Sequence, residues 1–306
     1  MAYKVMFSFP GQGAQCPGLL SDIPNRDYWM ARAQMALNRS LEDLDSAVSF
    51  HQTESVQLAL LIKGISCCEQ LSDFGVFPDI VCGLSIGAYT AAVCSGALSF
   101  EDALNLVSLR GKLMQQAYPT GYGMTAIIGL RLPEVEVICR DIPDLYVANY
   151  NAETQIVISG SEKAMQIACD KAYDIGAEKC IRLRVFVPSH CPLLSCAAKQ
   201  LNEVAKTIKF SRPQKAYLSA TSGRVLWKPE QIADDLVQNM ARRTQWHEAV
   251  EGAFERGVRL ALEMPPGETL TKLTRASAPD ICAMSVVTSS MADITQRYAN
   301  LRQLES

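Results

Sequence analysis

The chain has 306 residues, of which 48% are hydrophobic and 20% charged, a balance typical of a soluble enzyme with one large domain or one domain carrying a smaller one. Its formal net charge of -3 excludes broad electrostatic binding of nucleic acid, and no apolar run is long enough to span a membrane. We therefore expect a cytoplasmic protein that binds neither nucleic acid nor a membrane.

The first predicted elements alternate between strands and helices, which favours a largely parallel α/β core. The apolar run Val5–Phe9 is preceded by one Lys and followed by a proline, so it indicates a buried first strand rather than a signal peptide. Apolar residues at helical spacing predict a helix over Ser55–Phe74, and Ile80–Cys82 is a second strand that leads into an Ala-rich helix. Ser99 is placed to cap the next helix, Phe100–Ala117.

The section from about residue 125 to residue 185 has a different order of elements. The pattern predicts strand, helix, two paired strands, helix and strand, at Thr125–Leu130, Pro133–Arg140, Tyr146–Asn149, Gln155–Ser159, Ser161–Ile175 and Cys180–Val185. This βαββαβ order is that of a ferredoxin-like unit. Gly121, Gly123 and Pro188 mark the two crossings of the chain. We therefore expect a small domain of residues 124–186 inserted into a large domain of residues 1–123 and 187–306.

The rest of the chain completes the predicted large domain. We expect a helix at Cys191–Ile208, a helical stretch from Pro229 to about Arg256, a strand at Arg259–Glu263 and a C-terminal helix. No internal repeat and no low-complexity segment interrupts this order.

The strongest local signal is Gly83-Leu84-Ser85-Ile86-Gly87, which matches the G-x-S-x-G pattern of a nucleophile elbow. The pattern alone occurs often by chance, but here an apolar strand precedes it and a helix-forming run follows it. A sharp strand-to-helix turn exposes the serine hydroxyl, and the helix N-terminus favours negative charge there. We therefore predict Ser85 as a nucleophile, the alternative being a plain turn between a strand and a helix.

A serine nucleophile needs a base, and the chain has three histidines. His51 lies near a helix start and His247 in a charged helix, where we expect surface or capping roles. His190 lies in the irregular segment VPSHCP directly after the inserted unit, and a loop at a domain boundary suits a base. We predict His190 as the base, against a structural histidine. No Asp or Glu near it is an obvious third member, so a backbone carbonyl is one candidate for the group that orients its ring.

The eleven cysteines are scattered, and no CxxC pair occurs among them. A zinc site needs clustered Cys and His ligands, which this chain does not show in sequence. We expect no metal and reduced cysteines that pack as small hydrophobic residues.

Two further residues stand out. The loop after the first strand reads FPGQGAQ, where the Gln12 amide or a nearby N–H is a candidate donor to an oxyanion, although a simple loop is the plainer reading. It is not G-x-G-x-x-G, so it does not favour a dinucleotide site. Arg110 interrupts the apolar face of its helix, and its guanidinium is a candidate two-point clamp for a carboxylate if it is not simply solvated.

These signals, taken together and in this order, resemble the malonyl-CoA:acyl carrier protein transacylase family over essentially the whole chain. The matching segments are FPGQGAQ, the elbow at 83–87, RGKLMQ, TAIIGL, ANYN, VPSHC and PPGETLTKL. The resemblance implies an α/β-hydrolase-like large domain with a ferredoxin-like insertion, malonyl-CoA as substrate, no bound cofactor and an acyl carrier protein as partner. It also implies site roles: Ser85 as nucleophile, His190 as base, Arg110 as clamp for the malonyl carboxylate, Gln12 and the Ile86 N–H as oxyanion donors, and Asn239 as the amide supporting the histidine region.

The elbow departs from the family pattern. The family typically reads Gly-His-Ser-Leu-Gly-Glu, whereas this chain has Leu84 before the serine and Ala88 at the end. The sequence GLSIGA is similar to the epsilon subunit of malonate decarboxylase, which implies a dedicated carrier subunit with a phosphoribosyl-dephospho-CoA arm as acceptor. The alternatives are the housekeeping transacylase of fatty acid synthesis, a serine esterase or thioesterase, and an inactive scaffold.

Overall fold

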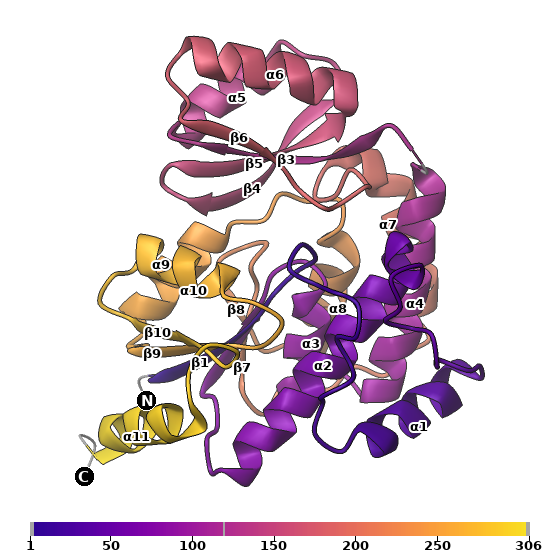
Figure 1. The fold of residues 1–306 in the computed structure, drawn as a ribbon, viewed down its shortest axis with the longest axis vertical. Coiled ribbons are helices and arrows are strands. Elements are labelled where there is room, and N and C mark those ends of the chain that lie inside the picture. Colours follow the sequence, from indigo (N-terminus) through magenta and orange to yellow (C-terminus); the bar gives the residue numbers. More distant parts are fainter. Residues whose placement is uncertain (1–2, 119, 304–306) are drawn as a thin grey trace.

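The computed structural model of the chain describes residues 3–118 and 120–303, and Figure 1 shows two β-sheets, one above the other. The larger sheet has the strand order β10-β9-β1-β2-β7-β8, formed by Cys282–Ser285, Leu260–Glu263, Val5–Phe9, Ile80–Gly83, Ala216–Leu218 and Val225–Leu226. Its strands are parallel except β8, which runs antiparallel to β7. The predicted largely parallel core is confirmed.

Helices cover both faces of the larger sheet because its strands are apolar on both sides. Along β1, Val5, Phe7 and Phe9 belong to one hydrophobic core, whereas Met6 belongs to another. The first core is shared with α1 (Arg26–Leu37), α2 (Thr53–Asp73), α3 (Gly87–Cys94), α4 (Phe100–Ala117), α7 (Ser195–Ala205), α8 (Pro229–Gln238) and α11 (Met291–Gln303). The second is shared with α9 (Trp246–Glu255) and α10 (Thr269–Ser277).

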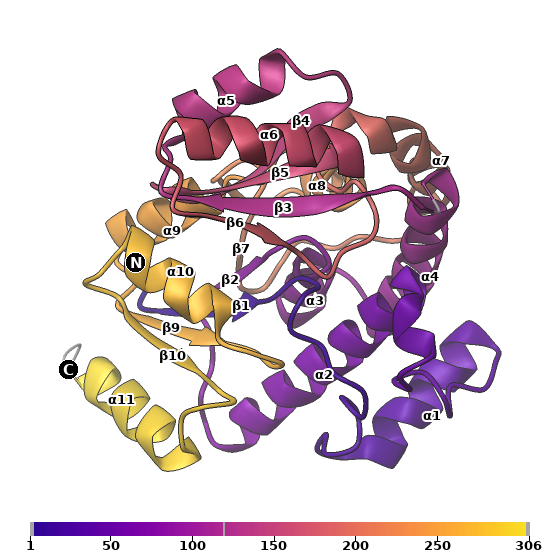
Figure 2. The same ribbon diagram turned by 45° about the horizontal axis from the view of Figure 1, so that its top comes forward.

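The smaller sheet is antiparallel and has the strand order β4-β5-β3-β6, formed by Leu145–Ala152, Gln155–Ser161, Tyr122–Ile128 and Lys179–Arg182. Its outer face is covered by α5 (Leu132–Arg140) and α6 (Glu162–Asp174), which share a separate hydrophobic core with it. Figure 2 shows its other face turned toward the large sheet. The predicted βαββαβ order is confirmed, and Gly123, expected at a crossing, lies inside β3.

Backbone hydrogen bonds join the small sheet to the loop that follows α8. Thr244, in the loop of residues 239–245, donates its N–H to the carbonyl of Ala148 at 2.8 Å, and its own carbonyl accepts from the N–H of Tyr150 at 2.8 Å. Asn149 and Thr244 therefore form a parallel bridge that ties β4 to the loop. This contact fixes the small sheet against the segment that follows α8.

Several predicted elements differ from the structure. The helical stretch expected from Pro229 to about Arg256 is wrong as one element, because the 239–245 loop separates α8 from α9. The backbone of that loop bonds to the His190 segment and to β4 instead of continuing the helix. The helix expected at Cys191–Ile208 begins as a short 3-10 turn, η2 (Pro192–Leu194), before α7.

The sequence pattern also missed elements. It gave no helix for α1 and no strand for β7, β8 or β10. It predicted one C-terminal helix where the structure has two, α10 and α11. A 3-10 turn, η1 (Ser49–His51), precedes α2. The predicted bounds of α4 are confirmed, and the Ser99 side chain caps it by accepting from the N–H of Asp102. All eleven cysteines are free. Six are buried, as expected of small hydrophobic residues, whereas Cys16, Cys196 and Cys282 are exposed.

Candidate active site

Ser85 lies on a sharp turn between β2 and α3. Its φ of 57° is left-handed, a conformation that side-chain-bearing residues seldom adopt outside functional turns. The flanking glycines are required by space: a Cβ at Gly83 would lie 2.1 Å from the carbonyl carbon of Gly87, and one at Gly87 would lie 2.1 Å from the carbonyl oxygen of Phe9. The turn thus holds the hydroxyl directly before the N-terminus of α3.

The loop after β1 lies beside this turn. The N–H of Leu84 donates to the carbonyl of Phe9 at 2.9 Å, and the Gln12 Oε1 accepts from Nε2 of the buried Gln57 at 3.0 Å. The backbone N–H groups of Gln12 and Ile86 donate to no other residue in the described part of the chain. Both therefore remain available to a ligand at Ser85.

Arg110 comes from α4 and is completely buried behind Ser85. One guanidinium nitrogen, Nη2, donates to Ser85 Oγ and to Asn239 Oδ1, each at 3.2 Å. Nε and Nη1 are buried without a partner among the described residues, and the guanidinium carbon lies 5.8 Å from the ring centre of Tyr89. Burial lowers the pKa of this guanidinium, although arginine stays charged in proteins. The site therefore contains a buried cation that lacks a carboxylate partner.

Asn239 is the C-cap of α8 and contacts three of the other candidate residues. Its Nδ2 donates to the backbone carbonyl of Ser85 at 3.2 Å, while its Oδ1 accepts from Arg110. Its own backbone carbonyl lies 2.6 Å from Nδ1 of His190. One buried residue thus links the elbow, the cation and the histidine.

His190 lies in the loop before η2, is buried, and has a left-handed φ of 61°. Its backbone N–H donates to the carbonyl of Met240 at 2.7 Å. Because a carbonyl only accepts, the contact with Asn239 places the ring proton on Nδ1 and leaves Nε2 as an acceptor. The group that orients the ring is a backbone carbonyl, the candidate that the sequence left open, with Thr244 Oγ1 3.3 Å from the same Nδ1.

Burial, together with the positive charge of Arg110, lowers the pKa of His190 to about 4. The imidazole is therefore neutral at physiological pH. The ring contacts with Asn239 and Thr244 are both made through Nδ1, and Ser85 Oγ bonds to Arg110 rather than to His190. A neutral imidazole with its proton on Nδ1 is the form that a proton acceptor needs.

Ser85 and His190 open into one cavity of about 340 Å³, which we call the Ser85 cavity. It lies between the ends of β1 and β2 and the inner face of the small sheet. The large-sheet side contributes Gln12, Leu84, Ser85 and His190, and the small-sheet side contributes Met124, Ala126, Asn149, Asn151 and Val157. Much of the wall is apolar, as in most small-molecule sites.

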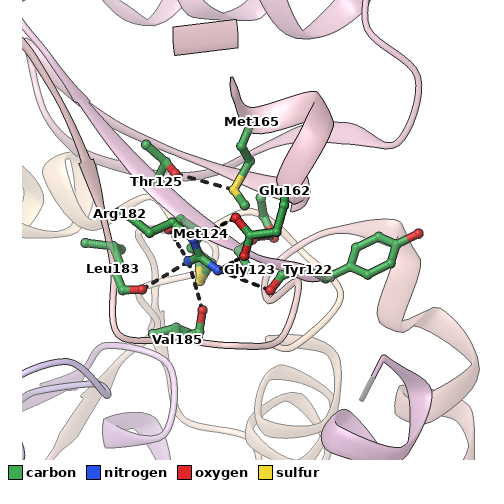
Figure 3. A network of polar contacts seen from close by, with 10 residues as sticks. Tyr122, Gly123, Met124, Thr125, Glu162, Met165, Arg182, Leu183 and Val185 are labelled. Atoms are coloured by element: carbon green, nitrogen blue, oxygen red, sulfur yellow. Dashed lines mark hydrogen bonds and ion pairs between the residues drawn. The ribbon is translucent and has the colours of Figure 1, made fainter. Parts of the chain in front are cut away.

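Arg182, at the end of β6, fixes the segment that leads to His190 (Figure 3). Its Nη1 donates to the carbonyls of Met124, Leu183 and Val185 at 2.8 to 3.1 Å, and Nη2 donates to that of Tyr122 and to Glu162. Gly123 gives it room, because a Cβ there would lie 1.9 Å from Nη2. We call residues 183–187 the crossover segment; three of them line the Ser85 cavity.

The remaining histidines lie away from Ser85. His51 is exposed in η1, as expected. The expected surface role of His247 is wrong: it is buried, its Nδ1 lies 2.8 Å from Ser277 Oγ, and its ring packs on Tyr150. No group of three or more His, Cys, Asp or Glu in the described ranges is placed to hold a metal ion. No helix of the described residues is long and apolar enough to cross a membrane.

The structure adds residues to which the sequence analysis gave no role. Gln57, Thr244, Asn149 and Asn151 contact or line the site from elements far apart in the chain. Only the last two carried a signal, as part of the ANYN segment. The others lie in patterns that look like ordinary helix or loop.

Comparison with known proteins places this arrangement in context. The family described as acyl transferase domain matches residues 6–302. The malonyl CoA-acyl carrier protein transacylase of Haemophilus influenzae is 34% identical over 296 residues, which cover 92% of this chain and 95% of that protein. The protein of the same name from Escherichia coli K12 is 33% identical over 292 residues, covering 92% and 94%.

Solved structures agree with these relatives. An acyl carrier protein S-malonyltransferase from Vibrio cholerae superposes with a TM-score of 0.88 at 32% identity, over 95% of this chain and 99% of the other. A type II polyketide synthase acyl carrier protein in complex with its malonyl-transacylase gives 0.88 at 32% identity, over 97% and 99%. The chain therefore belongs to the acyl transferase domain family and, within it, to the malonyl-CoA–acyl carrier protein transacylases.

Proposed function

We propose that this enzyme moves a malonyl group from malonyl-CoA to the thiol of an acyl carrier protein through a malonyl-Ser85 intermediate. The observation that carries the proposal is the buried guanidinium of Arg110, 3.2 Å from Ser85 Oγ and without a carboxylate partner among the described residues. A malonyl group esterified to Ser85 would supply that carboxylate. An acetyl group would leave the cation unpaired.

In the first half of the reaction, Nε2 of His190 accepts the proton of Ser85 Oγ, and Oγ attacks the thioester carbonyl carbon. The negative charge on the carbonyl oxygen is stabilised by the Ile86 N–H and by Gln12, through its N–H or its amide. The carbon–sulfur bond then breaks, and the CoA thiolate takes the proton from His190. Malonyl-Ser85 and free CoA remain.

In the second half, the carrier thiol gives its proton to His190, and its sulfur attacks the malonyl-Ser85 carbonyl. The ester bond breaks, and Ser85 Oγ recovers the proton. Asn239 has a supporting role in both halves because it holds the histidine ring, the elbow and Arg110 together. No bound cofactor or metal enters these steps.

There are two candidate acceptors for the malonyl group. The elbow sequence GLSIGA favours the carrier subunit of malonate decarboxylase, whereas the names of the relatives favour the acyl carrier protein of fatty acid synthesis. Both acceptors present a thiol on a flexible arm, so the chemistry at Ser85 is the same. Transfer rates to the two purified carriers, measured side by side, decide between them.

A serine hydrolase is the competing reaction class. Such enzymes orient the histidine with an Asp or Glu. Here the ring partner is the backbone carbonyl of Asn239. This feature supports transfer to a thiol over hydrolysis. The scaffold alternative finds no support, since Ser85 and His190 are both present.

The proposal extends to architecture and location. We propose an α/β-hydrolase-like domain of residues 1–123 and 187–306, and a ferredoxin-like domain of residues 124–186; residues 1, 2 and 304–306 lie outside the described part. The separate sheets, and the separate core between the small sheet and helices α5 and α6, support this division. A cytoplasmic location is supported by the eleven free cysteines and by the soluble thioester substrates.

Mass spectrometry of the intact chain after brief exposure to malonyl-CoA tests the proposal. The wild type should gain one malonyl group on Ser85 and lose it when a carrier with a free thiol is added. Ser85→Ala should abolish the adduct, whereas Ser189→Ala, a control serine on the same cavity, should keep it. An adduct that survives Ser85→Ala, for example on a cysteine, contradicts the mechanism.

A further inference from the structure

Gln57 is a polar residue in the buried middle of α2. Its side chain is completely buried, and its Oε1 atom has no hydrogen-bond partner among the described residues. A buried acceptor without a partner costs free energy, so an apolar side chain of similar shape would give a more stable fold. A stabilising role in the core therefore does not explain this residue.

The donor half of the same amide contacts the loop that follows β1. Gln57 Nε2 donates to Gln12 Oε1 at 3.0 Å and lies 3.6 Å from Met114 Sδ. An amide oxygen and a thioether sulfur are both acceptors, so both contacts assign the NH₂ group to this end of Gln57. Gln57 thus acts on Gln12 as a hydrogen-bond donor.

This contact decides which end of the Gln12 amide is left for a ligand. Gln12 lines the Ser85 cavity, and residues 10–16 around it form no helix or strand that would fix its position. With Oε1 held by Gln57, the remaining polar atom of the Gln12 side chain is the donor Nε2. An oxyanion at Ser85 is stabilised by donors, whereas an inverted amide would present a repelling oxygen.

The support behind Gln12 is a packed pair of helices. The helices α2 and α4 approach closely at Gly111, where a Cβ would lie 2.4 Å from the Cα of Glu54. Gln57 and Met114 are each three residues further along these helices, so their contact lies about one turn from the close approach. Gln57 is therefore anchored on rigid elements, as a residue that positions another one requires.

We propose that Gln57 is a positioning residue that holds the Gln12 amide with its NH₂ group toward the oxyanion of the transition state. This inference rests on the proposed function and deepens it. Gln57 acts on the reaction through Gln12, without touching the substrate. Since malonyl and acetyl thioesters form the same oxyanion, Gln57 sets the rate of loading but not the choice of acyl group, in contrast to Arg110.

The test is a double-mutant cycle between the two glutamines. The rate constant for loading Ser85 is measured by rapid quench over a range of malonyl-CoA concentrations for the wild type, Gln57→Met, Gln12→Ala and the double variant. Methionine keeps an unbranched side chain and removes the donor. Gln115→Met is the matched control: the Gln115 amide also contacts α2, by accepting from the N–H of Thr53 at 2.8 Å, but it lines a different cavity.

In Gln57→Met the loading rate at saturation should fall about 5-fold, the effect of roughly one ordinary hydrogen bond. The half-saturating concentration should change less than about 2-fold, because the oxyanion forms only in the transition state. In the Gln12→Ala background the same substitution should change the rate less than about 2-fold, because the residue through which Gln57 acts has been removed. Acetyl-CoA should show the same fractional loss as malonyl-CoA.

The melting temperature separates positioning from a structural role. It should stay the same or rise in Gln57→Met, because a buried unpaired acceptor is removed. In Gln115→Met it should fall while the loading rate stays unchanged, because the N–H at the start of α2 loses its partner. Gln57→Leu repeats the comparison if methionine does not fit.

Two outcomes would overturn this role. An undiminished loss in the Gln12→Ala background would show that Gln57 acts by another route, and a changed malonyl-to-acetyl ratio would make that route Arg110. Unchanged loading in both Gln57→Met and Gln57→Leu would show that other contacts hold Gln12. Failure of the wild type to form any malonyl adduct is a separate result, which contradicts the proposed function itself.

Discussion

Arg110 offers the sharpest test of how this site selects its substrate. Its guanidinium is completely buried, and the only side-chain acceptors it has among the described residues are Ser85 Oγ and Asn239 Oδ1, both neutral. Arg110→Met replaces the aliphatic stem of the arginine with an unbranched apolar side chain and removes the charged guanidinium. In the free enzyme this replaces an uncompensated buried cation with a hydrophobic group. In the malonyl-enzyme it removes the partner of the carboxylate.

The structure predicts that Arg110→Met lowers malonyl transfer but raises the stability of the free protein. Breaking a buried ion pair by removing one partner costs about 3–5 kcal/mol, so kcat/KM for malonyl-CoA should fall by roughly 10²- to 10⁴-fold. Acetyl-CoA has no carboxylate that could pair with Arg110, so its kcat/KM should stay the same or rise. The free variant should be more stable than the wild type by about 1–2 kcal/mol, because hydrophobic replacement of buried charges is often stabilising.

The assay is kcat/KM for malonyl-CoA and acetyl-CoA in the wild type, Arg110→Met and Arg110→Lys, with thermal unfolding of each free protein. Arg110→Lys should recover only part of malonyl transfer, because an ammonium cannot form the planar two-point contact. Arg32→Met, which breaks an ion pair with Glu101 on α4, is the control and should leave the substrate ratio unchanged. A malonyl-to-acetyl ratio unchanged in Arg110→Met would refute the reasoning and make Arg110 a structural residue.

Further predictions concern His190, Asn239 and Arg182. Since the pKa of His190 is about 4, loading should be independent of pH from about 5 to 8 and fall only near pH 4, and His190→Ala should slow it by about 10²–10⁴-fold. The free energy of unfolding should decrease as pH falls from 6.5 toward 4, because the unfolded histidine binds a proton that the folded one does not; a stability that rises over this window contradicts the shift. Asn239→Leu loses its contacts with Arg110 and Ser85, of which the charge-assisted one is worth about 1.5–3 kcal/mol, so loading should fall about tenfold or more. Its pH profile should not move, because the backbone carbonyl that holds His190 stays, and a shifted profile counts against this assignment. Arg182→Ala releases the carbonyls of the crossover segment, so limited proteolysis should cut within residues 183–187 faster than in the wild type, and unchanged cleavage would show that the segment is held by other contacts.

The candidate residues that the sequence pattern itself indicated have local signals, whereas Asn239 came only from the family resemblance. The elbow around Ser85 consists of a strand, a glycine-flanked turn and a helix in adjacent residues. Because both glycines are sterically required, the motif can be recognised from the sequence. The α4 helix with its Ser99 cap and the βαββαβ order are likewise set by neighbours in the chain. His190 stood out because the chain has few histidines and one lies in an irregular segment.

What the tertiary structure decided depends on contacts between distant residues. The carbonyl that orients His190 belongs to Asn239. It is available to the ring because helix α8 ends there. No proline or glycine in residues 239–245 indicates that the helix ends. Those backbone groups bond to His190 and to β4, and these long-range bonds outweigh helical propensity. The burial that leaves Asn149 and Asn151 unsatisfied arises only when the two sheets close over one cavity. Arg110 becomes an unpaired buried cation only when its helix packs against the elbow and Asn239.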